Sequence, residues 1–271
     1  MVNLSIDGLP VEAADGATIL EAAKQNDINI PTLCYLEGVH AVGACRVCVV
    51  EVEGARTLQA SCMVPARDSM VVRTATKTVR GARKMLYELI MSDHPGACLS
   101  CVRNQNCELQ SLGGRLGVRE SRFESRTRPG VLDLTPSIVR DTGKCILCRR
   151  CVTVCNEVQQ VGVLNAQNRG FQTVVGPAMD LSMSDVDCSY CGQCTVVCPV
   201  GALSEADATG PVWRALDDPS KRVVVQVAPA IRVALGEEFT MPPGTLVTGK
   251  LATALRRLGF DDVFDTNFAA D

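Results

Sequence analysis

Residues 145–155 read CILCRRCVTVC, and residues 188–198 read CSYCGQCTVVC. Both stretches have the cysteine spacing C-x2-C-x2-C-x3-C, so the chain carries an internal duplication. In proteins with this spacing, three closely spaced thiolates bind one 4Fe-4S cluster, while the fourth binds the cluster of the other copy. The repeat therefore predicts two 4Fe-4S clusters with exchanged ligands, one on Cys145, Cys148, Cys151 and Cys198, the other on Cys155, Cys188, Cys191 and Cys194.

A second group of cysteines lies near the start of the chain, within a β-rich pattern. Asp7-Gly8 is a hairpin signal, a short helix is expected over 18–25, and further strands are expected over 47–52 and 70–73. Four thiols on such a scaffold suit a 2Fe-2S cluster. A structural zinc ion is the less favoured alternative, because zinc sites usually use two close cysteine pairs. His40 is expected to be a solvated loop residue, and the expected ligands are Cys34, Cys45, Cys48 and Cys62.

A third group follows an amphipathic helix that is predicted over 78–92. Its expected buried side carries Val79, Ala82, Leu86, Leu89 and Ile90, and its solvated side carries Arg80, Arg83, Lys84 and Glu88. Pro95 and Gly96 end the helix. The adjoining spacing H-x3-C-x2-C-x5-C combines imidazole with thiols, which are both ligands for soft metals. We expect a third 4Fe-4S cluster on His94, Cys98, Cys101 and Cys107.

The composition indicates that metal binding accounts for the cysteines. Fifteen cysteines and His94 make sixteen ligands, which is four clusters of four ligands with none left over. The first residues carry no signal peptide, and no apolar run approaches the roughly 18 residues of a membrane-spanning helix. A net charge of −3 gives no general attraction to nucleic acid. We therefore expect a soluble, cytoplasmic protein that binds neither nucleic acid nor a membrane.

Two sets of basic residues each have two interpretations. The polar stretch 119–137 is expected to be a linker; its arginines could dock a partner, but a solvated connector is favoured. These arginines are Arg119, Arg122, Arg126 and Arg128. Around the first cysteine run of the repeat, basic side chains either offset the charge of a bound cluster or form an ordinary solvated surface. This second set is Lys144, Arg149 and Arg150.

Together these patterns predict an α+β multidomain chain. The expected parts are a β-grasp 2Fe-2S ferredoxin domain (1–76), a small helical 4Fe-4S domain with one His and three Cys ligands (77–118), the linker (119–137), a two-cluster bacterial-ferredoxin domain (138–210) and an incomplete α/β segment (211–271).

The α/β segment is expected to begin after a linker at Gly210-Pro211. It should contain a buried strand over 223–228, a helix over 250–258 and a second strand over 263–266. One strand–helix–strand unit cannot bury both faces of a parallel sheet. We therefore expect this segment to need more chain or a partner for stability.

Four clusters of different type in one chain favour an electron relay, in which the polypeptide sets spacing, burial and hydrogen bonds to sulfur. A purely structural cluster scaffold is the less favoured alternative. Dithiol catalysis by the CxxC pairs would leave half of the thiols unexplained. The sequence contains no Walker A loop, no GxGxxG after a strand and no Ser-His-Asp constellation. We expect nucleotide binding and hydrolysis elsewhere, and we predict no catalytic residue.

The order of these sites resembles the N-terminal module of several redox complexes. It is shared by the large iron–sulfur subunit of NADH dehydrogenases, NAD-linked formate dehydrogenases and the diaphorase small subunit of nickel–iron hydrogenases. The last part of the chain narrows the resemblance. VVVQVAPAIRVALGEEF (223–239) and GKLATALRRLGFDDVFDTNFAAD (249–271) are similar to the opening of the catalytic domain of iron-only (FeFe) hydrogenases.

The resemblance implies the relay part of an FeFe hydrogenase catalytic subunit of the NAD(P)-linked, electron-bifurcating type. It implies a hetero-oligomer with a flavin-containing NAD(P)H-oxidising subunit and a small thioredoxin-like 2Fe-2S subunit, and ferredoxin as a further partner. The family binds its hydrogen-activating cluster through a TSCCP-type segment, an MPC segment and a paired-cysteine segment, which are not among these residues. We therefore expect this chain to carry electrons without a complete catalytic site. The alternative is a stand-alone electron-transfer subunit of one of the other NAD(P)-linked complexes.

Overall fold

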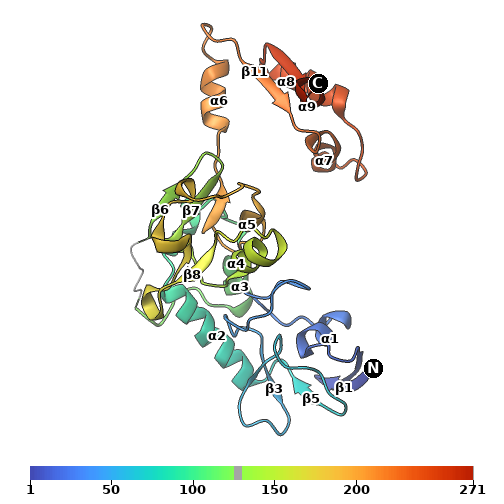
Figure 1. Ribbon diagram of the computed structural model, residues 1–271. Helices are drawn as coiled ribbons and strands as arrows, with labels where there is room; N and C mark the ends of the chain where they lie inside the picture. The colour runs from blue at the N-terminus through green and yellow to red at the C-terminus, as the bar shows by residue number, and fades with distance from the viewer. Residues whose placement is uncertain (125–129, 271) are drawn as a thin grey trace. The chain divides into compact units, whose positions relative to one another are not determined.

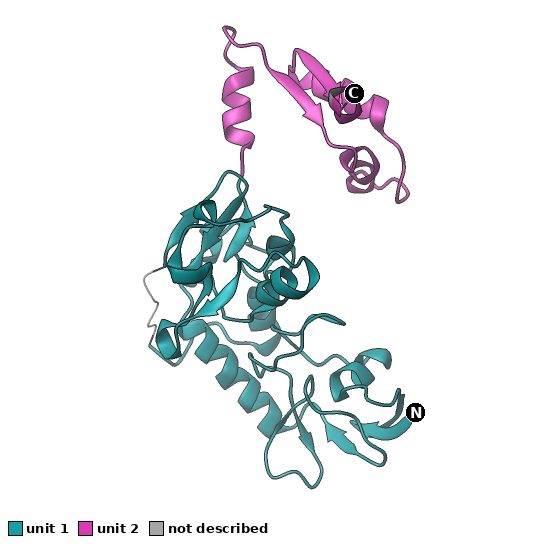
Figure 2. Ribbon diagram, in the orientation of Figure 1, with its two compact units in different colours: residues 1–206 teal, residues 207–271 magenta. Residues whose placement is uncertain are grey.

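The structure is a computed structural model that describes residues 1–124 and 130–270. It divides into two compact units, residues 1–206 and residues 207–271 (Figure 1, Figure 2). No helix within the described residues is long and apolar enough to cross a membrane. The finer domain boundaries at residues 76, 118, 137 and 210 stay predictions.

A mixed five-stranded sheet and one helix begin the first unit. The strands are β1 (Val2–Ile6), β2 (Leu9–Ala13), β3 (Val49–Val52), β4 (Gln59–Ala60) and β5 (Val71–Arg73), in the order β2-β1-β5-β3-β4. The predicted hairpin is confirmed, since β1 and β2 pair antiparallel across Asp7-Gly8, and β1 pairs parallel with β5. Helix α1 (Ile19–Gln25) buries Ile19 and Leu20 in a core with Val50. Strand β3 starts later than predicted because Val47 and Cys48 lie in a turn.

Helix α2 (Lys77–Ser92) has the predicted extent, but the predicted division of its faces is partly wrong. Arg83 is 7% exposed and Glu88 is 6% exposed, whereas Leu89 is 46% exposed. Arg83 is buried because its Nη2 donates a hydrogen bond of 2.8 Å to the Val49 carbonyl oxygen in β3. Glu88 is buried because it accepts a 2.8 Å hydrogen bond from the Nε of Arg122, in the predicted linker.

The start of α2 offers a test of helix capping. Thr76 precedes the helix, and its Oγ1 accepts a 3.2 Å hydrogen bond from the Val79 N–H. Thr76→Ala is expected to lower the free energy of unfolding by about 1 kcal/mol, because this N-cap bond is lost. The matched control Thr78→Ala, at an exposed position in the first turn, should leave it unchanged or slightly higher. Urea unfolding measures both, and equal losses would contradict a capping role for Thr76.

The rest of the first unit contains short strands and helices around the repeated cysteine runs. Its elements are α3 (Glu108–Leu116), β6 (Leu132–Leu134), β7 (Ile138–Asp141), α4 (Arg150–Thr153) with a π-helical continuation (Val154–Val158), β8 (Asn165–Gln167), β9 (Val174–Gly176), α5 (Gln193–Val196) and β10 (Leu203–Glu205). The sheet order is β10-β7-β6, with β8 pairing β9 separately. Residues 119–137 are therefore not a linker throughout, because β6 pairs with β7. Arg126 and Arg128 lie outside the described residues.

The second unit contains both predicted strands and the predicted helix, with a further helix, α7 (Ile231–Glu238), between the strands that was not predicted. Its elements are α6 (Thr209–Leu216), β11 (Val224–Val227), α7 (Ile231–Glu238), α8 (Thr248–Leu258), β12 (Asp262–Asp265) and α9 (Thr266–Ala270), and β11 pairs parallel with β12. Two expectations were wrong. Gly210-Pro211 is not a linker but part of α6, since proline is tolerated in the first turn of a helix. Strand β11 is not fully buried, because Val224 on this two-stranded sheet is half exposed.

Candidate metal centres

Both cysteine runs fold with the same local backbone. Leu147 and Tyr190, each two residues after the first cysteine of its run, have positive φ angles of 55° and 52°. Their backbone N–H groups donate to the Sγ of Cys145 and Cys188 respectively, each over 3.4 Å. Arg149 and Gly192, also left-handed, then cap α4 and α5. Each run therefore curls around its first sulfur before entering a helix.

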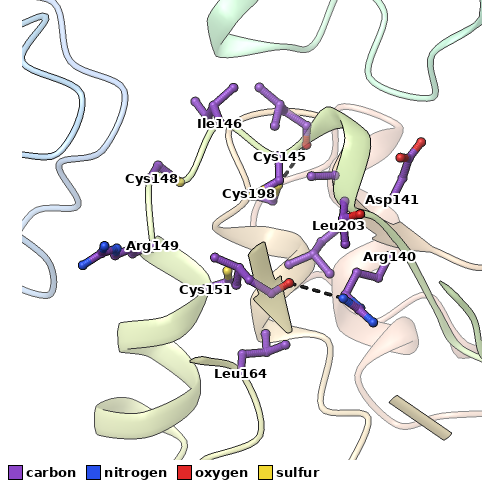
Figure 3. A pocket seen from close by; sticks show the side chains of 14 residues that line it. Arg140, Asp141, Cys145, Ile146, Cys148, Arg149, Cys151, Leu164, Cys198 and Leu203 are labelled. Carbon is purple, nitrogen blue, oxygen red and sulfur yellow. Dashed lines mark hydrogen bonds between the residues drawn. The ribbon is translucent and has the colours of Figure 1, made fainter. Parts of the chain in front are cut away.

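Figure 3 shows the cavity that the first run surrounds together with a residue of the second run. Cys145, Cys148 and Cys151 line it with Cys198, beside apolar Leu164 and Leu203 (Figure 3). The chain thus brings together the four residues that the repeat predicted to share a cluster. Burial, the largest effect, raises the pKa of the Cys148 thiol to about 12. A metal site with these donors would need to deprotonate them on binding.

A second cavity is lined by three cysteines of the second run and one cysteine of the first run. Cys188, Cys191 and Cys194 of the second run meet Cys155 of the first run there, with Ile138, Leu164 and Met183 as apolar neighbours. Cys155 reaches this cavity from the π-helical turn that follows α4. The exchange of the fourth cysteine between runs is therefore present in the geometry of both cavities.

The third cavity lies beyond the end of α2. His94, Cys98, Cys101 and Cys107 line it together with Lys144 and Gly201. Gly201 permits a close approach, because a Cβ atom there would lie 2.7 Å from the Cys101 Sγ. Burial and the charge of Lys144 lower the pKa of His94. The ring is thereby held neutral, which is the form that binds a metal.

The four N-terminal thiols form two pairs. The Sγ atoms of Cys48 and Cys62 lie 3.4 Å apart, and the Cys45 N–H donates to the Cys34 Sγ over 3.5 Å. Hydrogen bonds from their partner thiols lower the pKa of Cys45 and of Cys48. The loop between Cys34 and Cys45 requires a glycine at position 43. Its φ is 62°, and the Cβ atom of any other residue there would lie 2.9 Å from Met63 Cγ. Among the described residues, no three His, Cys, Asp or Glu side chains are grouped as for a single metal ion.

The expectation that His40 is solvated is wrong, because the ring is 4% exposed. His40 Nε2 lies 3.0 Å from the Cys148 carbonyl oxygen, and Nδ1 lies 2.5 Å from Thr153 Oγ1. A carbonyl only accepts, so Nε2 carries the proton and Nδ1 accepts from the hydroxyl. Burial lowers the pKa of His40, in agreement with a neutral ring. The loop of the N-terminal cysteines is thus fastened to the first run of the repeat.

The basic residues around the first run differ from one another. Arg149 is exposed, and its guanidinium points away from the cysteines (Figure 3). Lys144 forms an ion pair of 2.9 Å with Asp141 beside the His94 cavity. Arg150 is buried and paired with Glu108, so of the two interpretations the solvated surface is wrong for this residue. The sequence places Arg150 between two cysteines but contains no signal that Glu108 is its partner.

Four known protein families match successive parts of the chain, in the same order as the cysteine groups along the sequence. A 2Fe-2S iron–sulfur cluster binding domain matches residues 1–77, and the NADH-ubiquinone oxidoreductase-G iron–sulfur binding region matches residues 83–122. A 4Fe-4S dicluster domain matches residues 144–202. The C-terminal domain of the iron-only hydrogenase large subunit matches residues 221–271. The chain therefore contains both 2Fe-2S and 4Fe-4S domains.

The similarity to hydrogenases extends over the whole chain. The NADP-reducing hydrogenase subunit HndD of Solidesulfovibrio fructosivorans is 52% identical over 277 residues, covering 100% of this chain and 47% of that protein. Iron hydrogenase 1 of Clostridium pasteurianum is 36% identical over 274 residues, covering 100% of this chain and 48% of that protein. The chain resembles part of an iron-only hydrogenase. It thus spans about half the length of these relatives.

Other relatives match about three quarters of this hydrogenase-like chain. The NADH-ubiquinone oxidoreductase 75 kDa subunit of Reclinomonas americana is 37% identical over 206 residues, covering 75% of this chain and 29% of that protein. A crystal structure of an NAD+-reducing [NiFe]-hydrogenase in the H2-reduced state superposes with a TM-score of 0.72 and 28% identity. That similarity covers 76% of this chain and 88% of the solved one. These relatives include proteins other than iron-only hydrogenases, and the family match over residues 221–271 is the one that names the iron-only hydrogenases.

Proposed function

We propose that the chain binds one 2Fe-2S and three 4Fe-4S clusters and relays single electrons in an iron-only hydrogenase catalytic subunit. The observation that carries this proposal is that three separate cavities are each lined by one of the predicted ligand quartets. When bound, the clusters supply one-electron redox centres. The residues of the chain hold the clusters, bury them in apolar surroundings and donate backbone N–H groups to sulfur.

The architecture that we propose keeps the ligand sets separate. The β-grasp domain holds the 2Fe-2S cluster through the four thiols of Cys34, Cys45, Cys48 and Cys62. A small helical domain supplies His94 with Cys98, Cys101 and Cys107. A two-cluster ferredoxin domain supplies the exchanged sets described above. Electrons would pass between an NAD(P)H-oxidising flavin subunit, a small thioredoxin-like 2Fe-2S subunit or ferredoxin on one side and a hydrogen-activating site on the other.

Metal and sulfide analysis tests the proposal directly. Anaerobically purified chain is expected to contain about 14 iron atoms and about 14 acid-labile sulfides, the sum of one 2Fe-2S and three 4Fe-4S clusters. Stepwise reduction followed by electron paramagnetic resonance should show several reversibly reducible centres. Zinc in place of iron would contradict cluster binding. Clusters that cannot be reduced reversibly would leave a structural scaffold instead of a relay.

His94→Cys is expected to make the cluster of the third cavity harder to reduce. Three thiolates on a core of about +2 give a net charge of about −1, whereas four give about −2. The added negative charge opposes the incoming electron, so the reduction potential should become more negative. A redox titration monitored by electron paramagnetic resonance measures it, and the signals of the other clusters in the same sample are the control. A higher potential in His94→Cys would refute ligation by His94.

A further inference from the structure

Arg150 is a buried cation held by one carboxylate. Its side chain is 6% exposed, while that of Glu108 is 48% exposed. Two parallel hydrogen bonds join them, from Nη1 to Oε1 over 2.6 Å and from Nη2 to Oε2 over 2.9 Å. Such a forked pair fixes the guanidinium plane. The third guanidinium nitrogen of Arg150, Nε, is buried and has no hydrogen-bond partner.

The position of this pair relates it to three of the candidate centres. Arg150 lies between Cys148 and Cys151 in sequence. Glu108 directly follows Cys107, and its N–H donates to the carbonyl oxygen of Pro199, the neighbour of Cys198, over 2.9 Å. Burial opposes the charge of Arg150, but Glu108 and then the thiols of Cys148 and Cys34 raise its pKa above the ordinary value.

Contacts place the N-terminal thiols beside this pair. His40, in the N-terminal cysteine loop, contacts Cys148 and Thr153, which lie on either side of Arg150 in sequence. Leu33, the neighbour of Cys34, packs in one cluster with Cys107 and Leu109, which flank Glu108.

A second arginine provides a natural comparison. Arg83 is also buried, and its Nε also has no hydrogen-bond partner. Within the described residues, the Nε atoms of Arg83 and Arg150 are the buried side-chain donors that lack a partner. Burial lowers the pKa of Arg83, and the thiol of Cys48 opposes that shift. Arg83 Nη2 donates to the carbonyl oxygen of Val49, the neighbour of Cys48, so Arg83 lies beside the N-terminal thiols. Arg150 lies beside those thiols and the first run of the repeat.

We propose that the charge of Arg150 raises the reduction potentials of two clusters, the 2Fe-2S cluster on Cys34 and the 4Fe-4S cluster on Cys148. The opposite charge of Glu108 lowers both potentials. This rests on the proposed cluster binding. One-electron reduction adds one negative charge to a cluster without making or breaking a bond in the chain. A buried guanidinium stabilises that added charge, so it raises both potentials, and the carboxylate of Glu108 opposes it. Arg150 is not a ligand of either cluster and acts on both through its charge.

Substituting the two partners should shift the reduction potentials in opposite directions, which a purely structural role would not do. Arg150→Gln should shift both potentials to more negative values, and Glu108→Gln should shift them to more positive values. Both changes break the same ion pair, so a role limited to holding the fold would move the potentials in the same direction. Arg150→Lys keeps the charge and should retain most of the wild-type potential.

Redox titrations of the cluster-loaded full chain, monitored by electron paramagnetic resonance, test these signs. Loss of a signal in Cys34→Ala or Cys148→Ala assigns each signal to its cluster. The matched control is Arg149→Gln, which removes the same charge one residue away at an exposed position. The shift in Arg150→Gln should be about fourfold larger, because the effective dielectric constant falls from about 80 in water to about 20 near the protein. Arg83→Gln should shift the 2Fe-2S signal alone.

Each result decides between the proposals. Shifts of the same sign in Arg150→Gln and Glu108→Gln, or a shift no larger than that of Arg149→Gln, would overturn the role of Arg150 while leaving the relay intact. Wild-type chain without iron–sulfur signals would overturn the relay itself. If Arg150→Gln does not bind its clusters, the other two variants decide. A positive shift of both reduction potentials in Glu108→Gln, with nearly wild-type potentials in Arg150→Lys, supports the proposal. No positive shift in Glu108→Gln refutes it.

Discussion

Cys198→Ala is expected to remove the 4Fe-4S cluster of Cys145, Cys148 and Cys151, although Cys198 belongs to the other run. The first cavity has these three thiols and Cys198 in its lining, and the second cavity has Cys155 in the corresponding place. A cluster that lacks its fourth thiolate is lost or left with three irons. Iron content should fall from about 14 to between about 10 and about 13 per chain, and one 4Fe-4S signal should disappear.

The matched variant is Cys155→Ala, the same substitution at the equivalent position of the first run. It should remove the other 4Fe-4S signal, the one that Cys188→Ala also removes. Electron paramagnetic resonance of the reduced proteins distinguishes the two outcomes. If Cys198→Ala and Cys188→Ala eliminate the same signal, each run binds its own cluster and the exchange is wrong.

Asp133→Asn is expected to lower the free energy of unfolding by about 3–5 kcal/mol, because it leaves Arg140 buried without its counter-ion. The two side chains are 5% and 6% exposed, and Arg140 donates to Asp133 Oδ2 from Nε over 3.1 Å and from Nη2 over 2.9 Å. Ser182 Oγ donates to Oδ1 over 2.6 Å, and the Met183 N–H donates to Oδ2 over 3.0 Å. One carboxylate therefore joins β6, β7 and the segment that leads to the second cysteine run.

The pH dependence of this pair follows from the pKa of Asp133. Burial raises it, but the hydrogen bonds from Ser182, Met183 and Arg140 outweigh burial, and the pKa is lowered overall. A lowered pKa in the folded state gives a stabilisation that is present above the ordinary pKa and lost as the pH falls through the lowered one. It is therefore fully present at neutral pH, where urea unfolding followed by circular dichroism measures the loss.

Glu53→Gln is the control for this measurement. Glu53 and Arg73 also form an ion pair, at 3.3 Å, but both side chains are mostly exposed. Exposed pairs contribute about 0–1 kcal/mol, so this variant should unfold almost as the wild type does. A comparable loss in both variants would show that burial of the Asp133 pair is not the cause.

The grouping of the cysteines around the three cavities was predictable because cysteine spacing is local in sequence. Three cysteines within seven residues determine how the backbone curls, and the closely similar positive φ angles at Leu147 and Tyr190 follow from that spacing. The hairpin at Asp7-Gly8 was likewise predictable, because φ > 0 turns require such residues. These features depend on neighbours along the chain and on little else.

The buried charges were not predictable, because burial depends on segments distant in sequence. Helical periodicity assigns Arg83 and Glu88 to the solvated face of α2. The structure instead covers Arg83 with β3 and pairs Glu88 with Arg122. His40 is buried for the same reason, since Cys148 and Thr153 supply its partners. Tertiary contacts of this kind leave no periodic pattern in a single sequence.

The exchange of the fourth cysteine between the two runs also constrains biosynthesis. A nascent chain that has reached Cys155 has already exposed three thiols of the first cavity, but Cys198 is still to be translated. Under the proposed ligation, both cubane sites would therefore be completed only once the second run has emerged from the ribosome and docked against the first. Cofactor insertion at either site would then be a late event that depends on the other run, and a chain broken between the runs could complete neither site.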